Sequence, residues 1–586
     1  MNRKISFTCI CILLSLSLIS NVIPVYAQRV ESEIFPEISL GGKVDYLIIT
    51  TKSFREEVRP ILTWKIQKGL SAELLTVEEI QAQYSGKNLG EKIKNCIKDY
   101  FENNGTKWAL LAGDHPQVPS QYVEAVEDYP WDGDLVNCDS YYMDLDHNWD
   151  LNNDGIYGGE EDEYDFVPEV FIGRLPANDR AEMRDLILKV INYEKKPMIG
   201  EWMQKALFAG AITYFNMDWN GDNVVDFEEL DGNRFNHFIN VSHFAGWNTT
   251  FLAQTDGVKG SDYYSDMQLS QYNLKNEIDD GVSTCTVFAH GNPDRFGIHE
   301  WIVDYDSDLL FDYSACPFNE SGEPIDIQTF YDLLIVNSLD LNPEGKLGLY
   351  YLGSCSTGTF DQDDDCLAEA LLKKAAIGVV ASSYVTWGED AWYERDHGGW
   401  FIEGLAFRFW EQFMISNRPG EAFALAKEDY VADREVSLEP RVNTDWEQKV
   451  LKQYNLFCDP EVPIWTQIPL PLNVSKTLVS EENFTLVASA GGELIENATV
   501  TLEKEGKLLW MNQTDFNGEL FIPISNRSLK GITLTVSKDG YIPWQEHYPG
   551  DPIPIISGYN YLLFLPILIA VIFIGFLAKS NLELKH

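Results

Sequence analysis

Two short segments of this chain are apolar at almost every position, and each is followed at once by a reactive side chain. The segment from Cys285 to Ala289 leads into His290-Gly291, and the segment from Leu347 to Gly353 leads into Ser354-Cys355. A strand that is apolar throughout is typical of a parallel sheet that is buried on both faces. Ligands bind at the carboxyl ends of such strands. The pattern therefore predicts a histidine and a cysteine at one crevice of an α/β sheet.

The first part of the chain alternates short apolar runs with amphipathic segments, which predicts parallel α/β units. Strands are expected at Lys43–Thr51, Ala72–Thr76, Trp108–Ala112 and Phe166–Arg174. Helices are expected at Ser53–Lys68, Glu91–Asn103 and Asp179–Lys195. An acidic insertion from Asp128 to Asp165 interrupts this series. We expect a first α/β subdomain over residues 28–197.

A second α/β subdomain, over residues 198–469, is expected to carry the histidine and the cysteine. Further strands are predicted at Leu207–Thr213, Thr250–Ala253 and Gly378–Ala381. Helices are predicted at Asn233–Ala245, Leu269–Asp279, Cys366–Ala375 and Gly399–Phe413. The segment Ile327–Asn337 leads into the Cys355 strand.

The pattern changes after Pro469-Leu-Pro471, where apolar and polar residues begin to alternate without a helical period. Turn signals recur at Gly491-Gly492, Asn517-Gly518 and Asp539-Gly540. Short strands at such spacing predict a small β-sandwich over residues 472–548. No set of catalytic groups occurs in it, so we expect a spacer or stabilising module, followed by a proline-rich stalk at 549–558.

The two ends of the chain carry membrane-targeting patterns. Residues 1–27 have a positive start, an apolar core and small residues before a cleavage site at Ala27, which predicts a signal peptide. An uncharged 18-residue run from Tyr561 to Ala578 would span about 27 Å as a helix. We expect a transmembrane helix at 559–579 and a cytoplasmic tail at 580–586, with the bulk of the chain outside the cell. The alternative is a buried core helix.

Composition narrows the range of partners. The 586-residue chain has a formal net charge of −47, which disfavours nucleic acid as a partner because phosphate backbones require basic surfaces. Seven cysteines remain after the signal peptide, and an odd number outside the cell implies at least one unpaired thiol. Asn-x-Ser/Thr sequons, which suit an exposed glycoprotein, occur at Asn104, Asn240, Asn248, Asn319, Asn473, Asn483, Asn497, Asn512 and Asn526.

Cys355 and His290 are the candidate catalytic pair. Each residue alone has an ordinary structural explanation, as a buried thiol or a satisfied histidine. Together, at the ends of two apolar strands, they indicate nucleophilic catalysis, because an imidazole next to a thiol generates the reactive thiolate. Zinc is not expected, since neither His-Glu-x-x-His nor paired Cys-x-x-Cys occurs. No organic cofactor is expected.

Two acidic loops fit the twelve-residue pattern of calcium-binding EF-hand loops, which place oxygen ligands at fixed positions around one turn. The ligands of the first would be Asp150, Asn152, Asp154, Ile156 and Glu161. The ligands of the second would be Asp218, Asn220, Asp222, Val224 and Glu229. The alternative is a pair of solvated acidic loops. We expect structural Ca²⁺, and the second loop would brace the region of Asp231.

An ordered series of motifs resembles the gingipain family, in the caspase-like clan of cysteine peptidases. The motifs are Leu110–Asp114 with Val118-Pro119, Phe171–Pro176, Tyr193-Glu194, the strand ending in His290-Gly291, Cys355–Phe360 and Asn455–Pro460. The resemblance covers roughly residues 43 to 467, and Cys458 stands where Gly is expected. It implies a caspase- or gingipain-like parallel-sheet catalytic domain in two subdomains, followed by an immunoglobulin-like domain.

The resemblance also implies roles for further residues. The backbone N–H groups of Gly291 and Cys355 would form the oxyanion hole. Asp231 lies where the family places an acid that orients the histidine. Glu228 and Glu229 are alternatives for this role, and helix capping explains the presence of Asp231 equally well. Other members of the clan work with a Cys-His dyad alone. Trp387 would be a wall of the P1 pocket. A preference for Arg or Lys at P1 needs an acidic pocket floor, for which Asp361, Asp363 and Glu389 are alternatives.

The sequence thus predicts an extracellular, membrane-anchored cysteine endopeptidase that acts on peptide or protein substrates, and the resemblance implies cleavage after basic residues. The alternative is a cell-surface adhesion or envelope protein with an inactive peptidase fold.

Overall fold

The computed structural model describes residues 42–125, 135–218, 224–305, 307–312, 326–388, 399–436, 444–480, 483–523 and 529–549. The predicted signal peptide, transmembrane helix and tail lie outside these residues, as does nearly all of the stalk. Within the described part of the chain, the longest apolar helices fall short of what is needed to cross a bilayer.

The first subdomain is built on a four-stranded parallel sheet with the order β2-β1-β3-β6. Its strands are β1 (Tyr46–Thr50), β2 (Ala72–Thr76), β3 (Trp108–Ala112) and β6 (Phe171–Leu175). Its helices are α2 (Arg55–Gln67), α3 (Val77–Gln83), α4 (Leu89–Asn104) and α5 (Arg180–Lys195). Every residue of β1 and β3 is buried, as expected for strands that are apolar throughout and covered on both faces.

The second subdomain contains a seven-stranded sheet with the order β12-β11-β7-β13-β18-β19-β20. The strands are β7 (Lys205–Gly210), β11 (Asn248–Ala253), β12 (Met267–Gln268), β13 (Thr284–Phe288), β18 (Gly348–Gly353), β19 (Ala376–Ser382) and β20 (Tyr454–Phe457). All neighbours are parallel except β19 and β20. The helices are α6 (Gly232–His243), α7 (Gln271–Asp280), α8 (Leu367–Lys374), α9 (Phe401–Ser416), α10 (Pro419–Val436) and α11 (Thr444–Gln453).

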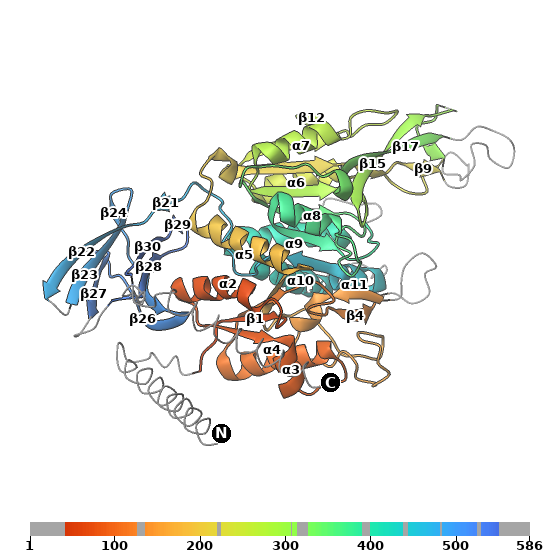
Figure 1. Cartoon of the computed structure of the whole chain (residues 1–586). Helices are drawn as coiled ribbons and strands as arrows, with labels where there is room; N and C mark the ends of the chain where they lie inside the picture. The colour runs from red at the N-terminus through yellow and green to blue at the C-terminus, as the bar shows by residue number, and fades with distance from the viewer. Residues whose placement is uncertain are drawn as a thin grey trace, which may run out of the picture.

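A small three-stranded sheet projects beyond the large one and begins at the candidate histidine. Its order is β14 (His290–Asn292), β15 (Arg295–Val303) and β17 (Ile327–Ile335), all antiparallel. Figure 1 places the β15–β17 hairpin at the end of the molecule opposite the C-terminal β-domain. The segment Ile327–Asn337, which precedes β18 in the chain, forms strand β17 over most of its length. Most side chains in the first half of this strand are exposed. Exposure on both faces removes the alternation by which a strand is recognised in a sequence.

The two α/β subdomains share one continuous hydrophobic core that extends from Tyr46 to Trp465. Arg174 of β6 is fully buried in it. Its guanidinium makes two hydrogen bonds to the Asp139 carboxylate, at 2.7 and 2.8 Å, and donates to the carbonyls of Gly113 and Val118. It also lies over the ring of Phe360, 5.0 Å from the centroid. Arg174 thus joins the loop after β3 to the segment that follows Cys355.

Cys458 occupies its position because its neighbours have no side chains. A Cβ atom on Gly378 would lie 2.7 Å from the Cys458 sulfur, and a Cβ on Gly173 would lie 2.4 Å from its carbonyl oxygen. The thiol donates to the carbonyl of Ile377 at 3.3 Å. A cysteine therefore fits where the resemblance suggested a glycine.

The C-terminal β-domain consists of two four-stranded antiparallel sheets that bury a common core of their own. One sheet contains β22 (Asn473–Ser480), β23 (Asn483–Ala490), β24 (Glu493–Leu494) and β27 (Glu519–Pro523). The other contains β25 (Thr499–Lys504), β26 (Lys507–Gln513), β28 (Thr533–Ser537) and β30 (Trp544–His547). Two shorter strands, β21 (Leu470–Pro471) and β29 (Tyr541–Ile542), pair beside them.

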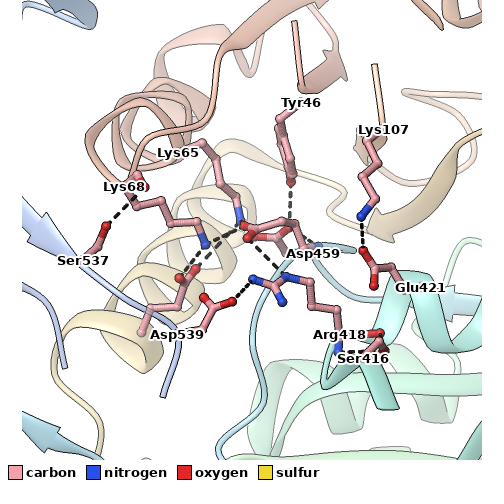
Figure 2. Close-up of polar contacts among 12 residues, drawn as sticks. Tyr46, Lys65, Lys68, Lys107, Ser416, Arg418, Glu421, Asp459, Ser537 and Asp539 are labelled. Atoms are coloured by element: carbon pink, nitrogen blue, oxygen red, sulfur yellow. Dashed lines mark hydrogen bonds and ion pairs between the residues drawn. The ribbon is translucent and has the colours of Figure 1, made fainter. Parts of the chain in front are cut away.

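A network of ion pairs, buried around Lys65 and exposed at Asp539, joins the first subdomain, the end of the second subdomain and the β-domain (Figure 2). Lys65 of α2 is fully buried and pairs with Asp459 at 2.5 Å and with Glu461 at 2.7 Å. Arg418 reaches Asp539 of the β-domain at 2.7 Å, and the Ser537 hydroxyl donates to the carbonyl of Lys68. These contacts fix the β-domain against α2, far from the strand ends that carry His290 and Cys355.

Candidate active site

Neighbouring parallel strands bring His290 and Cys355 to one pocket. β13 pairs with β18 in the register that sets Phe288 opposite Gly353. His290 and Cys355 each follow two residues after these positions, at the same edge of the sheet. Both line a pocket whose other walls come from β8 (Ile212–Tyr214), α6, the segment after β19, and α9. The crevice expected from the two apolar segments is therefore present.

The turn that carries Cys355 is held by backbone hydrogen bonds to the end of β19 and to the segment that follows it. The Ser356 amide donates to the carbonyl of Tyr384 at 2.8 Å, and the Gly358 amide donates to the carbonyl of Ser382 at 2.8 Å. Ser356 has a φ of 56°, in the left-handed region that is unfavourable for a non-glycine residue. Such strain is kept only where surrounding contacts enforce it. The Cys355 thiol itself donates to the carbonyl of Thr386 at 3.3 Å.

Gly291 lets the histidine segment pack directly on this turn. A Cβ atom at position 291 would lie 2.3 Å from the carbonyl oxygen of Cys355 and 2.9 Å from the Cβ of Ser354. A glycine is required at this position, because a side chain here would push His290 and Cys355 apart.

Cys355 differs from the other cysteines that the structure describes. Cys96, Cys138, Cys285, Cys366 and Cys458 are all buried, whereas Cys355 is partly exposed. None of these six is in a disulfide, and Cys316 lies outside the described residues. Burial raises the pKa of the five buried thiols, for example to about 12 for Cys96. Among the described cysteines, Cys355 alone has the access that a nucleophile needs.

His290 is held neutral by its surroundings. Its pKa is lowered to about 4, chiefly by burial and next by the charge of His299, while a hydrogen bond to the backbone carbonyl of Thr213 raises it. The His299 ring lies 4.6 Å away, centroid to centroid, at an interplanar angle of 89°. A neutral imidazole can accept the proton of a thiol, which is the role required of His290.

Asp231 lies at the start of α6 and is almost fully buried. Its carboxylate accepts hydrogen bonds from the Asn233 amide at 2.8 Å and from the Ser261 hydroxyl at 2.6 Å. Of its competitors, Glu228 is exposed, and burial raises the pKa of Glu229 to about 7. The backbone of Thr213, which has no sequence signature, is the hydrogen-bond partner of His290 in place of a carboxylate. A role for Asp231 in catalysis stays a prediction.

One charged residue of the pocket, Glu403, is absent from the sequence-based assignment. It lies in the first turn of α9, is 2% exposed and lines the pocket with His290 and Cys355. A Cβ atom on Gly388 would lie 2.7 Å from its Oε1 atom, so the carboxylate reaches the segment after Trp387. An acid in the apolar first turns of α9 was the available signal. Trp387 is half-buried, and its ring meets that of Trp446 at 5.2 Å.

Two of the three acids proposed for the pocket floor, Asp361 and Asp363, are absent from the pocket lining. Asp361 accepts a hydrogen bond from the hydroxyl of Tyr122, in the first subdomain, at 2.7 Å. Asp363 is exposed, and Glu389 lies outside the described residues. The acidic run after the nucleophile therefore joins the two subdomains through Asp361 instead of lining the pocket.

The first acidic loop has several features of a calcium loop. Oδ1 of Asp150 accepts a hydrogen bond from the Gly155 amide, and Gly155 has a φ of 87°, as the sharp turn requires. Oδ2 of Asp150 pairs with the Lys87 ammonium at 2.5 Å, so a cation already lies against this oxygen. The acid that closes the loop is Asp162, which accepts from the amides of Leu151 and Gly159, whereas Glu161 is exposed.

In the second acidic loop, Asn220 and Asp222 lie outside the described residues. Asp218 is buried, Val224 is exposed and Glu229 is partly buried. A different group, consisting of Asp144, Asp146, His147 and Asp165, has its ligand atoms within 4.8 Å of one another and could hold a metal ion.

Comparison with known proteins agrees with this geometry. The family model of peptidase family C25 matches residues 39–465. Gingipain R2 of Porphyromonas gingivalis is 20% identical over 528 residues, which are 84% of this chain and 55% of that protein. Lys-gingipain of the same organism is 25% identical over 176 residues, which are 30% of this chain and 9% of that protein. The chain thus spans about half the length of the first of these relatives, and far less of the second.

Two solved structures share the fold. The complex of the pro- and mature domains of RgpB of Porphyromonas gingivalis superposes with a TM-score of 0.56 at 16% identity, covering 86% of this chain and 100% of that one. The crystal structure of the Arg-specific cysteine proteinase gingipain R superposes with a TM-score of 0.55 at 15% identity, covering 88% of this chain and 100% of that one. The gingipain-like α/β fold is therefore confirmed.

Proposed function

The chain belongs to peptidase family C25, and from this premise we propose that it is a cysteine endopeptidase with Cys355 as nucleophile and His290 as proton carrier. One observation carries the proposal. The register of β13 and β18, together with the close contact at Gly291, brings the histidine to the one partly exposed thiol among the described cysteines.

The proposed reaction follows from these two side chains. His290 takes the proton of Cys355, and the thiolate sulfur bonds to the carbonyl carbon of the scissile peptide. Negative charge then develops on the carbonyl oxygen, for which the backbone N–H groups of Gly291 and Cys355 are the proposed donors. His290 returns its proton to the leaving amine as the C–N bond breaks. Water, activated by His290, then releases the acyl group from Cys355.

The hydrogen bond from Cys355 to Thr386 has a place in this scheme. It holds the thiol beside the wall segment that precedes Trp387. For catalysis the thiol must exchange this acceptor for His290. We propose that substrate bound against residues 386–388 displaces the contact and completes the pair.

We further propose a preference for basic P1 residues, supported by Glu403. A nearly fully buried carboxylate in the pocket of the nucleophile would pair with an Arg or Lys side chain and repel an acidic one. Trp387 remains the proposed pocket wall.

Structural calcium at the loop of Asp150, Asn152 and Asp154 is also part of the proposal, with Asp162 as a closing acid in addition to Glu161. The terminal sequence patterns support an extracellular protein anchored by its C-terminal segment, and the alternating pattern after Pro471 supports an immunoglobulin-like domain.

The test is cleavage of a peptide library by the full chain. Wild-type protein should cleave, and Cys355→Ala and His290→Ala should not. Cys285→Ala serves as the matched control, because it removes a buried thiol from β13 without touching the pocket. Cleavage that persists in Cys355→Ala would exclude the cysteine mechanism, and no cleavage by any of the proteins would favour an adhesion or envelope role.

A further inference from the structure

His299 on β15 packs against His290 and has no role in the scheme above. The two rings are perpendicular, with centroids 4.6 Å apart. The ring of Phe330, from β17, lies 5.0 Å from His299, also edge to face. The Nδ1 atom of His299 is buried and forms no hydrogen bond with any residue that the structure describes. The ring is therefore fixed by aromatic packing, and one of its polar atoms is enclosed without a partner.

One buried amide fixes the backbone around this histidine pair. The Gln254 side chain is fully buried. Its Nε2 atom donates to the carbonyl of His299 at 2.8 Å, and its Oε1 atom accepts from the amide of Ile212 at 3.2 Å. Ile212 precedes Thr213, whose carbonyl is the hydrogen-bond partner of His290. Gln254 thus joins the strand that supplies the acceptor to the strand that supplies the second ring.

We propose that His299 is a positioning residue for His290: its ring fixes the orientation of the His290 imidazole toward Cys355. The inference rests on the proposed function, because it takes His290 as the group that exchanges a proton with the thiol. A second aromatic ring restricts His290 and leaves both of its nitrogens available, one for the Thr213 carbonyl and one for the thiol.

The same contact has an electrostatic consequence. Two imidazoles at this separation disfavour double protonation, because like charges repel. The charge of His299 is the second cause, after burial, of the lowered pKa of His290. Burial also lowers the pKa of His299 itself. The other titratable groups that line the pocket around His290 are Tyr214 on β8, Cys355, and Glu403 on α9.

Two substitutions separate packing from charge. His299→Phe keeps an aromatic ring beside His290 but removes the second titratable group. It should retain most of kcat while the acid limb of kcat/KM moves to higher pH, because the pKa of His290 rises. His299→Ala removes both features, so it should also lower kcat by about 10- to 100-fold, the usual result of a misplaced catalytic group. Neither change should alter KM.

His237→Phe is the matched control. His237 lies on α6 and stacks on Phe251 with centroids 4.1 Å apart, so it is a second histidine packed on an aromatic ring, outside the pocket lining. Its removal should leave both kcat and the pH profile unchanged. Circular dichroism of all variants checks that they are folded.

An experiment that needs no catalysis separates this inference from the proposed function. In full-length Cys355→Ala protein, the His290 ring is titrated by NMR with and without His299→Phe. The inference expects His290 to titrate at higher pH in the double variant, whether or not the wild type cleaves peptides. An unchanged titration overturns it. It is also overturned if His299→Ala keeps wild-type kcat, or if both His299 variants lose activity equally while the acid limb stays in place.

Discussion

The backbone of Gly291 touches the backbone of Cys355. A Cβ atom on Gly291 would lie 2.3 Å from the carbonyl oxygen of Cys355, closer than real Cβ contacts allow. The carbonyl oxygen belongs to the backbone and the position of a Cβ is fixed by the backbone of residue 291, so neither can move aside as the end of a flexible side chain would. The distance between the histidine and the nucleophile is thus set by the absence of one methyl group.

Gly291→Ala should therefore separate the pair. We expect kcat to fall by about 100-fold, since an error near 1 Å in catalytic geometry costs about that much. Gly246→Ala is a control for loss of a glycine, because its Cβ would meet open space; it should lower stability by about 1 kcal/mol through its positive φ without changing kcat. Full activity of Gly291→Ala would contradict the assignment of this contact.

Glu403→Gln should change substrate choice more than catalysis. The carboxylate lines the pocket without being assigned any proton transfer. Loss of its charge should reduce kcat/KM for Arg and Lys at P1 by about 10-fold or more, because a charge-assisted contact is lost, while cleavage after neutral residues is retained. Glu411→Gln, in the same helix but outside the pocket lining, is the control. The P1 preference of both variants is measured with a peptide library. Preferred cleavage after acidic residues by the wild-type protein would overturn the assignment of Glu403 to the P1 pocket.

Arg174→Met should destabilise the fold strongly. The substitution leaves the Asp139 carboxylate buried without its two charged hydrogen bonds, a change that costs about 3–5 kcal/mol in comparable buried pairs. Arg184→Met removes an arginine that is more than half exposed and should leave stability unchanged. Urea denaturation measures both. If both substitutions lowered the free energy of unfolding by the same small amount, Arg174 would not be essential for holding the two subdomains together.

Stability should depend on pH through His243, a partly buried histidine whose Nε2 atom is enclosed. Burial lowers the pKa of His243 to about 4, below its value near 6.5 in an unfolded chain. Between these values the unfolded state binds the proton and the folded state does not, so the free energy of unfolding falls as pH decreases from about 6.5 to about 4. His243→Phe should flatten this decrease. Denaturation at several pH values tests it, and identical slopes for variant and wild type would contradict the expectation.

Calcium should raise the melting temperature of the full chain, and chelation should lower it. A ligand specific for the folded state contributes about 2.7 kcal/mol at a hundredfold excess over Kd. Asp150→Ala should remove part of the response, whereas Lys87→Met should increase the apparent affinity, because the ammonium no longer competes for the Asp150 oxygen. Asp185→Ala, an exposed acid on α5, is the control. If the melting temperature of every one of these proteins were the same with and without calcium, the proposal would be contradicted.

Much of the fold could be predicted from the sequence because burial imposes a pattern. Strands of the two sheets that are covered on both faces must be mostly apolar, and β1, β3, β13 and β18, which are buried at every position, contain no charged residue. The end of such a pattern marks the end of the strand, which is why His290 and Cys355 could be identified. By contrast, α10 and β15 were not predicted. Helix α10 buries Lys427, which donates hydrogen bonds to the Ser140 hydroxyl and to two carbonyls. In β15 the polar residues Arg295, His299 and Glu300 interrupt the apolar pattern.

The sequence by itself determined which two side chains perform the proposed chemistry and which strands carry them. Only the tertiary structure decided that β13 and β18 are neighbours and that Glu403 reaches the pocket from α9. It also decided that His290 is hydrogen-bonded to the backbone of Thr213 and packed on His299. The physical reason is that strand formation depends on the burial of nearby residues. The surroundings of a catalytic group are instead made by backbone atoms and by side chains far along the chain, and these approach one another only once the sheet has formed.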